Sequence, residues 1–238
     1  MALAGGGFLV WLGYRLRTKR SQEHARSESL VQVRKLCEED IALLGEDLRR
    51  LDAEAVPFDE GVQVDLEAAR NAHKGAEQSV GWITDADEIG KVTESIASGR
   101  YALACVQARV EGRPVPKLRV PCFFNPQHGP SVFDVAFTAP GHGTHKVPAC
   151  SSDVARVRAN EKPDIREVEV AGRRVPYFDA GSSCAPYGAS YFTGETAIQE
   201  LFMMGTSWSG EERTGFASDP QGLHSEDPNQ PWRGRPRQ

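Results

Sequence analysis

Apolar side chains recur at steps of three and four over the first third of the chain. Between residues 30 and 51 these positions hold Leu30, Val33, Cys37, Ile41, Leu44, Leu48 and Leu51. Such spacing places them on one face of an α-helix, as at the a and d positions of a coiled coil. The pattern therefore predicts a long amphipathic helix that ends before Pro57. Charged residues between the apolar positions, Glu39 and Asp40 among them, are expected on its solvated face.

Two more helices are predicted after Pro57. A weaker, alanine-rich seam runs through Val62, Leu66, Ala69, His73, Ala76 and Val80, and a third through Ile89, Val92, Ile96, Leu103, Val106 and Val110. Thr84 and Asp87 have the spacing of a capping box, which predicts the start of the third helix. Because the connections are short, neighbouring helices should be antiparallel. We therefore predict a three-helix bundle or coiled coil over residues 28–112, with His73 partly exposed or hydrogen-bonded.

The periodicity changes from helical to β after residue 112. Three prolines keep residues 111–121 out of helix, and apolar alternation over 131–138, a Pro/Gly loop and a returning segment at 146–149 predict a β-hairpin. Cys150 then stands where a short helix begins, with Ser151 and Ser152 as candidate caps. The predicted class is therefore α+β, with a small treble-clef-like β-hairpin domain over residues 118–205.

Two pairs of metal-ligating residues flank this hairpin. Cys122 and His128 bracket a turn that contains Pro126, and Cys150 and Asp153 lie three residues apart at the start of the predicted helix. Zinc takes thiolate, imidazole and carboxylate donors, and donors close in sequence can be aimed at one ion by a tight turn. The four residues are therefore the predicted metal site, with zinc as the expected cofactor.

Three alternatives to this site stay open. The first is another fourth ligand, since His142 or His145 can replace Asp153. The spacing of the first pair, Cys-x5-His, also differs from the typical Cys-x2-Cys. The thiols can also be buried without a metal. The third alternative is a disulfide between Cys122 and Cys150.

The rest of the chain predicts a second hairpin and a polar end. Apolar residues at 165–170 and 175–178 flank a turn at Gly172. Ile198, Leu201, Phe202 and Met203 predict one amphipathic helix. Residues 207–238 are rich in Gly, Pro, Ser and charge, which predicts a disordered tail.

The N-terminus has the composition of a membrane anchor. Residues 1–14 carry no charge and are followed by Arg15, Arg17, Lys19 and Arg20. A helix of this length reaches about 21 Å, less than the ~30 Å hydrocarbon core. The chain therefore starts upstream of Met1, the helix tilts into one leaflet, or residues 1–20 form an adhesive or disordered tail. Basic residues after a span favour the cytoplasmic side, so we expect a location at the cell membrane with the soluble part cytoplasmic.

Composition narrows the partners further. The chain of 238 residues has a formal net charge of −5 and, outside the N-terminus, no long basic run, so no nucleic-acid partner is expected. Five cysteines at irregular spacing are unlike a secreted disulfide scaffold and favour a reducing compartment.

Four stretches together resemble a known family. They are GRYALACVQARVEGRPVP, CFFNPQHGPS, VPACSSDVARV and GRRVPYFDAG, preceded by the N-terminal segment with its basic flank. Over roughly residues 5 to 192 the chain resembles a family of uncharacterised membrane-anchored actinobacterial proteins, whose motif is CFF-[DN]-P-x-HG. The resemblance implies architecture only.

Two functions are compatible with these patterns. The first is a non-enzymatic, membrane-tethered interaction or scaffold module with a protein partner and a structural zinc site. The second is a hydrolase that depends on a metal or on a Cys/His pair such as Cys122 and His128. The first is favoured, because the sequence contains no GxSxG, HExxH, P-loop or dinucleotide motif.

Overall fold

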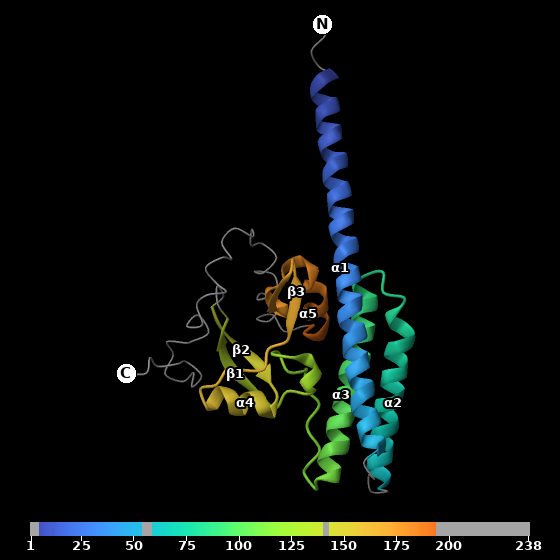
Figure 1. Ribbon diagram of the computed structural model, residues 1–238, viewed down its shortest axis with the longest axis vertical. Helices are drawn as coiled ribbons and strands as arrows, with labels where there is room; N and C mark the ends of the chain where they lie inside the picture. The colour runs from blue at the N-terminus through green and yellow to red at the C-terminus, as the bar shows by residue number, and fades with distance from the viewer. Residues whose placement is uncertain (1–4, 54–58, 140–142, 194–238) are drawn as a thin grey trace, which may run out of the picture.

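The computed structural model describes residues 5–53, 59–139 and 143–193. In these ranges the chain forms five α-helices and two small antiparallel sheets, which confirms the predicted α+β class. The three long helices come first: α1 (Gly5–Ala53), α2 (Glu60–Val80) and α3 (Ala86–Val110). Figure 1 shows the second half of α1 beside α2 and α3, with the small sheets on the other side of α3.

The three helices pack along the predicted seams. Val33, Cys37, Leu44 and the other central positions of the first seam are buried. Leu44 lies so close to α3 that a Cβ atom built on Gly99 would be 2.7 Å from its Cδ2 atom. Only a glycine allows this approach without displacement of the leucine.

The predicted start of α3 is wrong by one residue. Its N-cap is Asp85, whose carboxylate accepts from the backbone N–H of Glu88 at 3.0 Å. The Glu88 carboxylate reaches back to the N–H and hydroxyl of Thr84. Asp85 is therefore the N-cap, because Asp accepts as well as Thr at this position, and Glu88 bonds to the residue before the cap.

Helix α1 extends beyond the other elements at its N-terminal end (Figure 1). Within the described ranges, no helix has both the length and the hydropathy needed to cross a membrane. The predicted transmembrane helix of residues 1–20 is thus not found there, and residues 1–4 lie outside the description. The uncharged run of this helix gives way to Arg15, Arg17 and Lys19.

Both predicted hairpins are present. Strands β1 (Phe133–Thr138) and β2 (Thr144–Ala149) pair with Phe133 opposite Ala149, and α4 (Ser151–Arg158) follows directly. Strands β3 (Glu167–Val170) and β4 (Arg173–Pro176) are joined by Ala171 and Gly172, with φ angles of 51° and 75°. Positive φ at both central residues is the geometry that a two-residue hairpin turn requires.

The chain then folds into three short helical segments, η2 (Tyr177–Asp179), η3 (Gly181–Ser183) and α5 (Ala185–Tyr191). Sequence patterns did not predict them, because each is too short to show a period. The amphipathic helix predicted at 198–203 and the tail predicted at 207–238 lie outside the described residues.

One hydrophobic core joins the two halves of the chain. It contains Val33, Cys37 and Ile41 of α1 together with most of the buried residues after position 120. Phe123 lies at its centre, and its ring contacts those of Phe124, Phe137, Tyr177, Phe178 and Phe192. The α1 seam is therefore covered by α2, α3 and this aromatic cluster, and the coiled-coil interpretation gains no support.

Candidate metal centre

A tight turn brings Cys122 and His128 together. The Cys122 N–H donates to the carbonyl of Gly129 at 3.0 Å, and the turn between them includes the 3-10 helix η1 (Pro126–His128). The Asn125 side chain caps η1 by accepting from the backbone N–H of Gln127. Gly129 ends it with a φ of 79°, a conformation that favours glycine. Cys122 and His128 consequently lie on the same side of one short loop.

The first hairpin then brings the second pair beside the first. The N–H of Phe123 donates to the carbonyl of Pro148 at 2.8 Å, which fixes the end of β2 against the turn. Cys150 is the N-cap residue of α4, and Asp153 lies in the first turn of this helix. The prediction that Ser151 or Ser152 caps this helix is wrong, because α4 begins at Ser151 and both serines lie inside it.

The four predicted ligands converge on one point. One ligand atom from each of Cys122, His128, Cys150 and Asp153 lies within 4.8 Å of all the others, so the group can hold a metal ion. Both sulfur atoms are 3.3 Å from Asp153 Oδ2. His128 Nδ1 is 2.9 Å from the same oxygen and 3.6 Å from Cys150 Sγ.

The centre is almost closed to solvent. Cys122 and Asp153 are fully buried, Cys150 is 5% exposed and the His128 side chain is 20% exposed. All five cysteines of the chain lie in the described ranges and all are free thiols, so the disulfide alternative is wrong for this structure.

The two thiols differ in acidity. Burial raises the pKa of Cys122, which keeps its proton. The hydrogen bond from Cys122 lowers the pKa of Cys150 to about 5, against the effect of burial and with help from His128 and Ser152. Position at a helix N-terminus also favours the Cys150 thiolate. Cys150 is therefore the more acidic of the two thiols in the metal-free centre.

His128 and Asp153 form an ion pair in the metal-free centre. Burial alone lowers the pKa of His128, but Asp153 and Cys150 outweigh it and raise the pKa to about 10. Burial raises the pKa of Asp153, and the stronger opposing effects of His128 and of the Asp164 backbone N–H lower it. A metal ion would displace the Cys122 thiol proton and the His128 Nδ1 proton and would supply the positive charge that the thiolates and the carboxylate require.

Asp164 supports two of the four ligands and was not predicted. Its backbone N–H donates to Asp153 Oδ1 at 2.9 Å, and its carboxylate oxygen lies 3.3 Å from His128 Nε2. Ligating histidines usually donate their second ring N–H to a carboxylate in this way. No spacing rule links Asp164 to the other residues, so only the folded chain identifies it.

The two alternative histidines do not join the centre. His145 lies on β2 and does not belong to the converging group. His142 lies outside the described residues. His73 on α2 is 18% exposed and lies 3.5 Å from Glu77, in agreement with the expectation of a partly exposed histidine.

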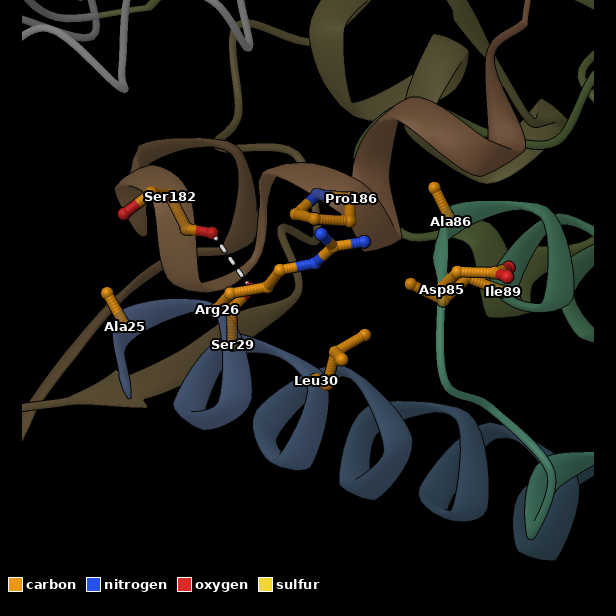
Figure 2. A pocket seen from close by; sticks show the side chains of 9 residues that line it. All are labelled: Ala25, Arg26, Ser29, Leu30, Asp85, Ala86, Ile89, Ser182 and Pro186. Atoms are coloured by element: carbon orange, nitrogen blue, oxygen red, sulfur yellow. Dashed lines mark hydrogen bonds between the residues drawn. The ribbon is translucent and has the colours of Figure 1, made fainter. Parts of the chain in front are cut away.

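A pocket of about 260 Å³ lies elsewhere, where α1 meets the start of α3, η3 and the start of α5. Figure 2 shows the residues that line it: Ala25, Arg26, Ser29, Leu30, Asp85, Ala86, Ile89, Ser182 and Pro186. Ser29 donates to the Ser182 carbonyl at 3.0 Å and closes one side. The lining is mainly apolar, and it shares no residue with the metal centre.

Comparison with known proteins finds no similarity: no family model, no curated protein and no solved structure matches the chain. The resemblance to the actinobacterial family consequently stays a prediction. What can be said of function follows from the centre itself.

Proposed function

We propose that Cys122, His128, Cys150 and Asp153 bind a structural zinc ion in a non-enzymatic interaction module. The observation that carries this proposal is the convergence of the four donor atoms within 4.8 Å. Thiolate, imidazole and carboxylate together form a donor set that suits zinc better than calcium or magnesium, which prefer oxygen donors alone.

The distances support a tetrahedral ion. With Zn–S bonds of about 2.3 Å and Zn–N or Zn–O bonds of about 2.0 Å, sulfur and nitrogen or oxygen donors stand about 3.5 Å apart. The corresponding separations here are 3.3, 3.3 and 3.6 Å. The 2.9 Å between His128 and Asp153 is a hydrogen-bond distance, and this pair must open slightly to admit the ion.

The closed character of the centre supports a structural role. Four protein donors occupy all four positions of a tetrahedral ion, whereas a catalytic zinc keeps one position for water or substrate. The order of turn, hairpin and helix that presents them is that of a treble-clef module. We propose a helical part over residues 28–112 and this module over 118–205, which share one hydrophobic core, with 1–20 and 207–238 as the flanking segments.

A Cys/His hydrolase is the second candidate, with Cys150 in place of the expected Cys122 as its nucleophile, because burial raises the pKa of Cys122. One observation favours it. The His128 ring lies between Cys150 Sγ, at 3.6 Å from Nδ1, and the Asp164 carboxylate, at 3.3 Å from Nε2. Nucleophile, base and orienting group stand in this order in thiol hydrolases. Burial counts against it, since Cys150 is 5% exposed and a substrate carbonyl would need the centre to open.

The module would be tethered to a membrane and bind a protein. The side chains of Arg17, Lys19 and Arg20 are exposed, and basic side chains on a helix attract anionic headgroups. Sedimentation of the full chain with vesicles of anionic lipid at physiological salt tests the tether. Protein that stays entirely in the supernatant would contradict it.

Metal content tests the centre directly. The purified full chain should contain about one zinc ion, by elemental analysis, and Cys150→Ser or Asp153→Asn should reduce this to a small fraction. Cys105→Ser is the matched control, because Cys105 is equally buried but lies on α3 outside the centre. Wild-type protein without zinc whose Cys150 reacts rapidly with an alkylating reagent would favour the hydrolase.

A further inference from the structure

A buried carboxylate on α1 joins this helix to the second half of the chain. Asp40 is fully buried, although its position in a charged run predicted a solvated face. Its Oδ2 atom accepts from the hydroxyls of Tyr187 at 2.6 Å and Tyr191 at 3.0 Å. Its Oδ1 atom accepts from the Gln127 amide and lies 3.0 Å from the Arg166 guanidinium. A buried carboxylate with four such partners is a specific attachment point.

Two of these partners belong to segments that also build the metal centre. Gln127 lies in the turn between Cys122 and His128, adjacent to a ligand. Arg166 stands two residues after Asp164, and its backbone N–H donates to the Phe124 carbonyl in the same turn at 2.8 Å. Asp40 is therefore linked to the centre in two ways. Gln127 is next to the ligand His128, and Arg166 is two residues from Asp164, which contacts the ligands Asp153 and His128.

We infer that metal binding and the attachment of α1 are coupled through Gln127 and Arg166. This inference rests on the proposed zinc site. The ion would fix the turn from 122 to 129, and the fixed turn holds the Gln127 amide against Asp40 and the Phe124 carbonyl against Arg166. Coupling between two binding events is reciprocal, so loss of the Asp40 contact must weaken zinc binding as much as loss of zinc weakens the contact.

One variant separates this coupling from the ligands themselves. Gln127→Met keeps the length of the side chain and all four donors but removes the amide that bonds Asp40. A hydrogen bond to a charged group is among the stronger ones in proteins. If the bound ion holds this bond in place, its loss should raise the zinc dissociation constant about tenfold. Tyr191→Phe is the matched control, because it removes one hydrogen bond from the same carboxylate through α5. That control should leave zinc affinity within about twofold.

A second measurement needs no variant. Addition of zinc to metal-free full-length protein should slow hydrogen exchange of backbone amides at residues 33–41 of α1 more than at residues 62–69 of α2. The α1 segment belongs to the core shared with the metal-binding half, whereas Val62, Leu66 and Ala69 belong to a separate cluster. Exchange protection reports the local opening free energy on both segments.

The outcomes distinguish the two proposals. Wild-type protein that binds no zinc overturns the proposed site and this inference with it. Wild-type protein that binds one zinc, with unchanged affinity in Gln127→Met and equal protection of both helices, leaves the site intact and overturns the coupling alone. Weaker binding in Gln127→Met, normal binding in Tyr191→Phe and selective protection of residues 33–41 support it.

Discussion

Two glycines inside helices should respond in opposite directions to the same substitution. Gly99 of α3 is buried, and a Cβ atom added there would lie 2.7 Å from Leu44 Cδ2 and 3.4 Å from Ala72 Cβ. Gly75 of α2 has no atom within 4 Å of its added Cβ. Alanine at either position removes the same backbone freedom from the unfolded chain, so any difference between the variants reports the packing of the helices.

The expected free energies follow from these contacts. Replacement of glycine by alanine within a helix stabilises by about 0.8 to 1.0 kcal/mol. Gly75→Ala should gain about this amount. Gly99→Ala gains the same amount and loses about 1 to 3 kcal/mol through overpacking against the buried Leu44, so its net effect is between about zero and 2 kcal/mol of destabilisation.

Urea unfolding followed by far-UV circular dichroism measures both variants. The double variant Leu44→Ala, Gly99→Ala supplies the internal control, because the alanine at 99 then fills space and should stabilise relative to Leu44→Ala alone. Equal stabilisation by Gly75→Ala and Gly99→Ala would refute the close approach of α1 and α3. So would an effect of Gly99→Ala that does not change when Leu44 is shortened.

Two further predictions concern the second half of the chain. Without metal, the lowered pKa of Cys150 contributes stability that is complete above about pH 9 and is lost as pH falls through about 5. The raised pKa of His128 contributes stability that is complete below about pH 6.5 and is lost as pH rises through about 10. The two contributions offset one another between about pH 6.5 and 9, so urea midpoints should be nearly constant there and should fall below about pH 6.5. Above about pH 9 the midpoints should also fall, because burial raises the pKa of other thiols as well, Cys37 and Cys184 among them. Persistence of the fall on the acid side in a Cys150→Ser, His128→Gln variant would contradict the assignment. Phe123→Ala should cost about 3 to 5 kcal/mol in urea unfolding, because the ring is fully buried at the centre of the aromatic cluster. Phe133→Ala, at a ring that is 56% exposed, should cost much less, and similar losses at both positions would show that Phe123 is not at the centre of the core.

Local periodicity was sufficient to predict the three long helices and both hairpins, but not the short helical segments η2, η3 and α5. The steps of three and four from Leu30 to Leu51 depend only on the 3.6-residue turn, and the buried positions of α1 match them. The second hairpin was predicted because Gly172 stands between two β-rich runs. The Thr84 cap was misplaced because Asp85 beside it is an equally good cap, a choice that local sequence leaves undecided.

The ligands were predictable for a different reason. Cys122 and His128 share one turn and Cys150 and Asp153 share another, so each pair is fixed locally, and a single hairpin joins the pairs. The supporting groups depend on contacts across the whole fold. The Asp40 carboxylate was assigned to solvent because its partners Tyr187 and Tyr191 lie 147 and 151 residues away. No window of sequence contains both sides of such a contact.

The long separation of these contacts along the chain also delays their formation during synthesis. Ser29 bonds to Ser182, 153 residues later, and Asp40 bonds to Tyr191 at a similar separation. At about 5 to 20 residues per second, a ribosome needs roughly 8 to 30 s to add that length of chain. Leu44 and Leu48 can be covered once α2 and α3 have emerged, because they share a core cluster with those helices. Val33, Cys37 and Ile41 share their core with residues after 120, so this part of the apolar stripe of α1 is not fully covered until the second half of the described chain has been made. Such transiently exposed apolar surface is what makes a partly synthesised chain prone to aggregation.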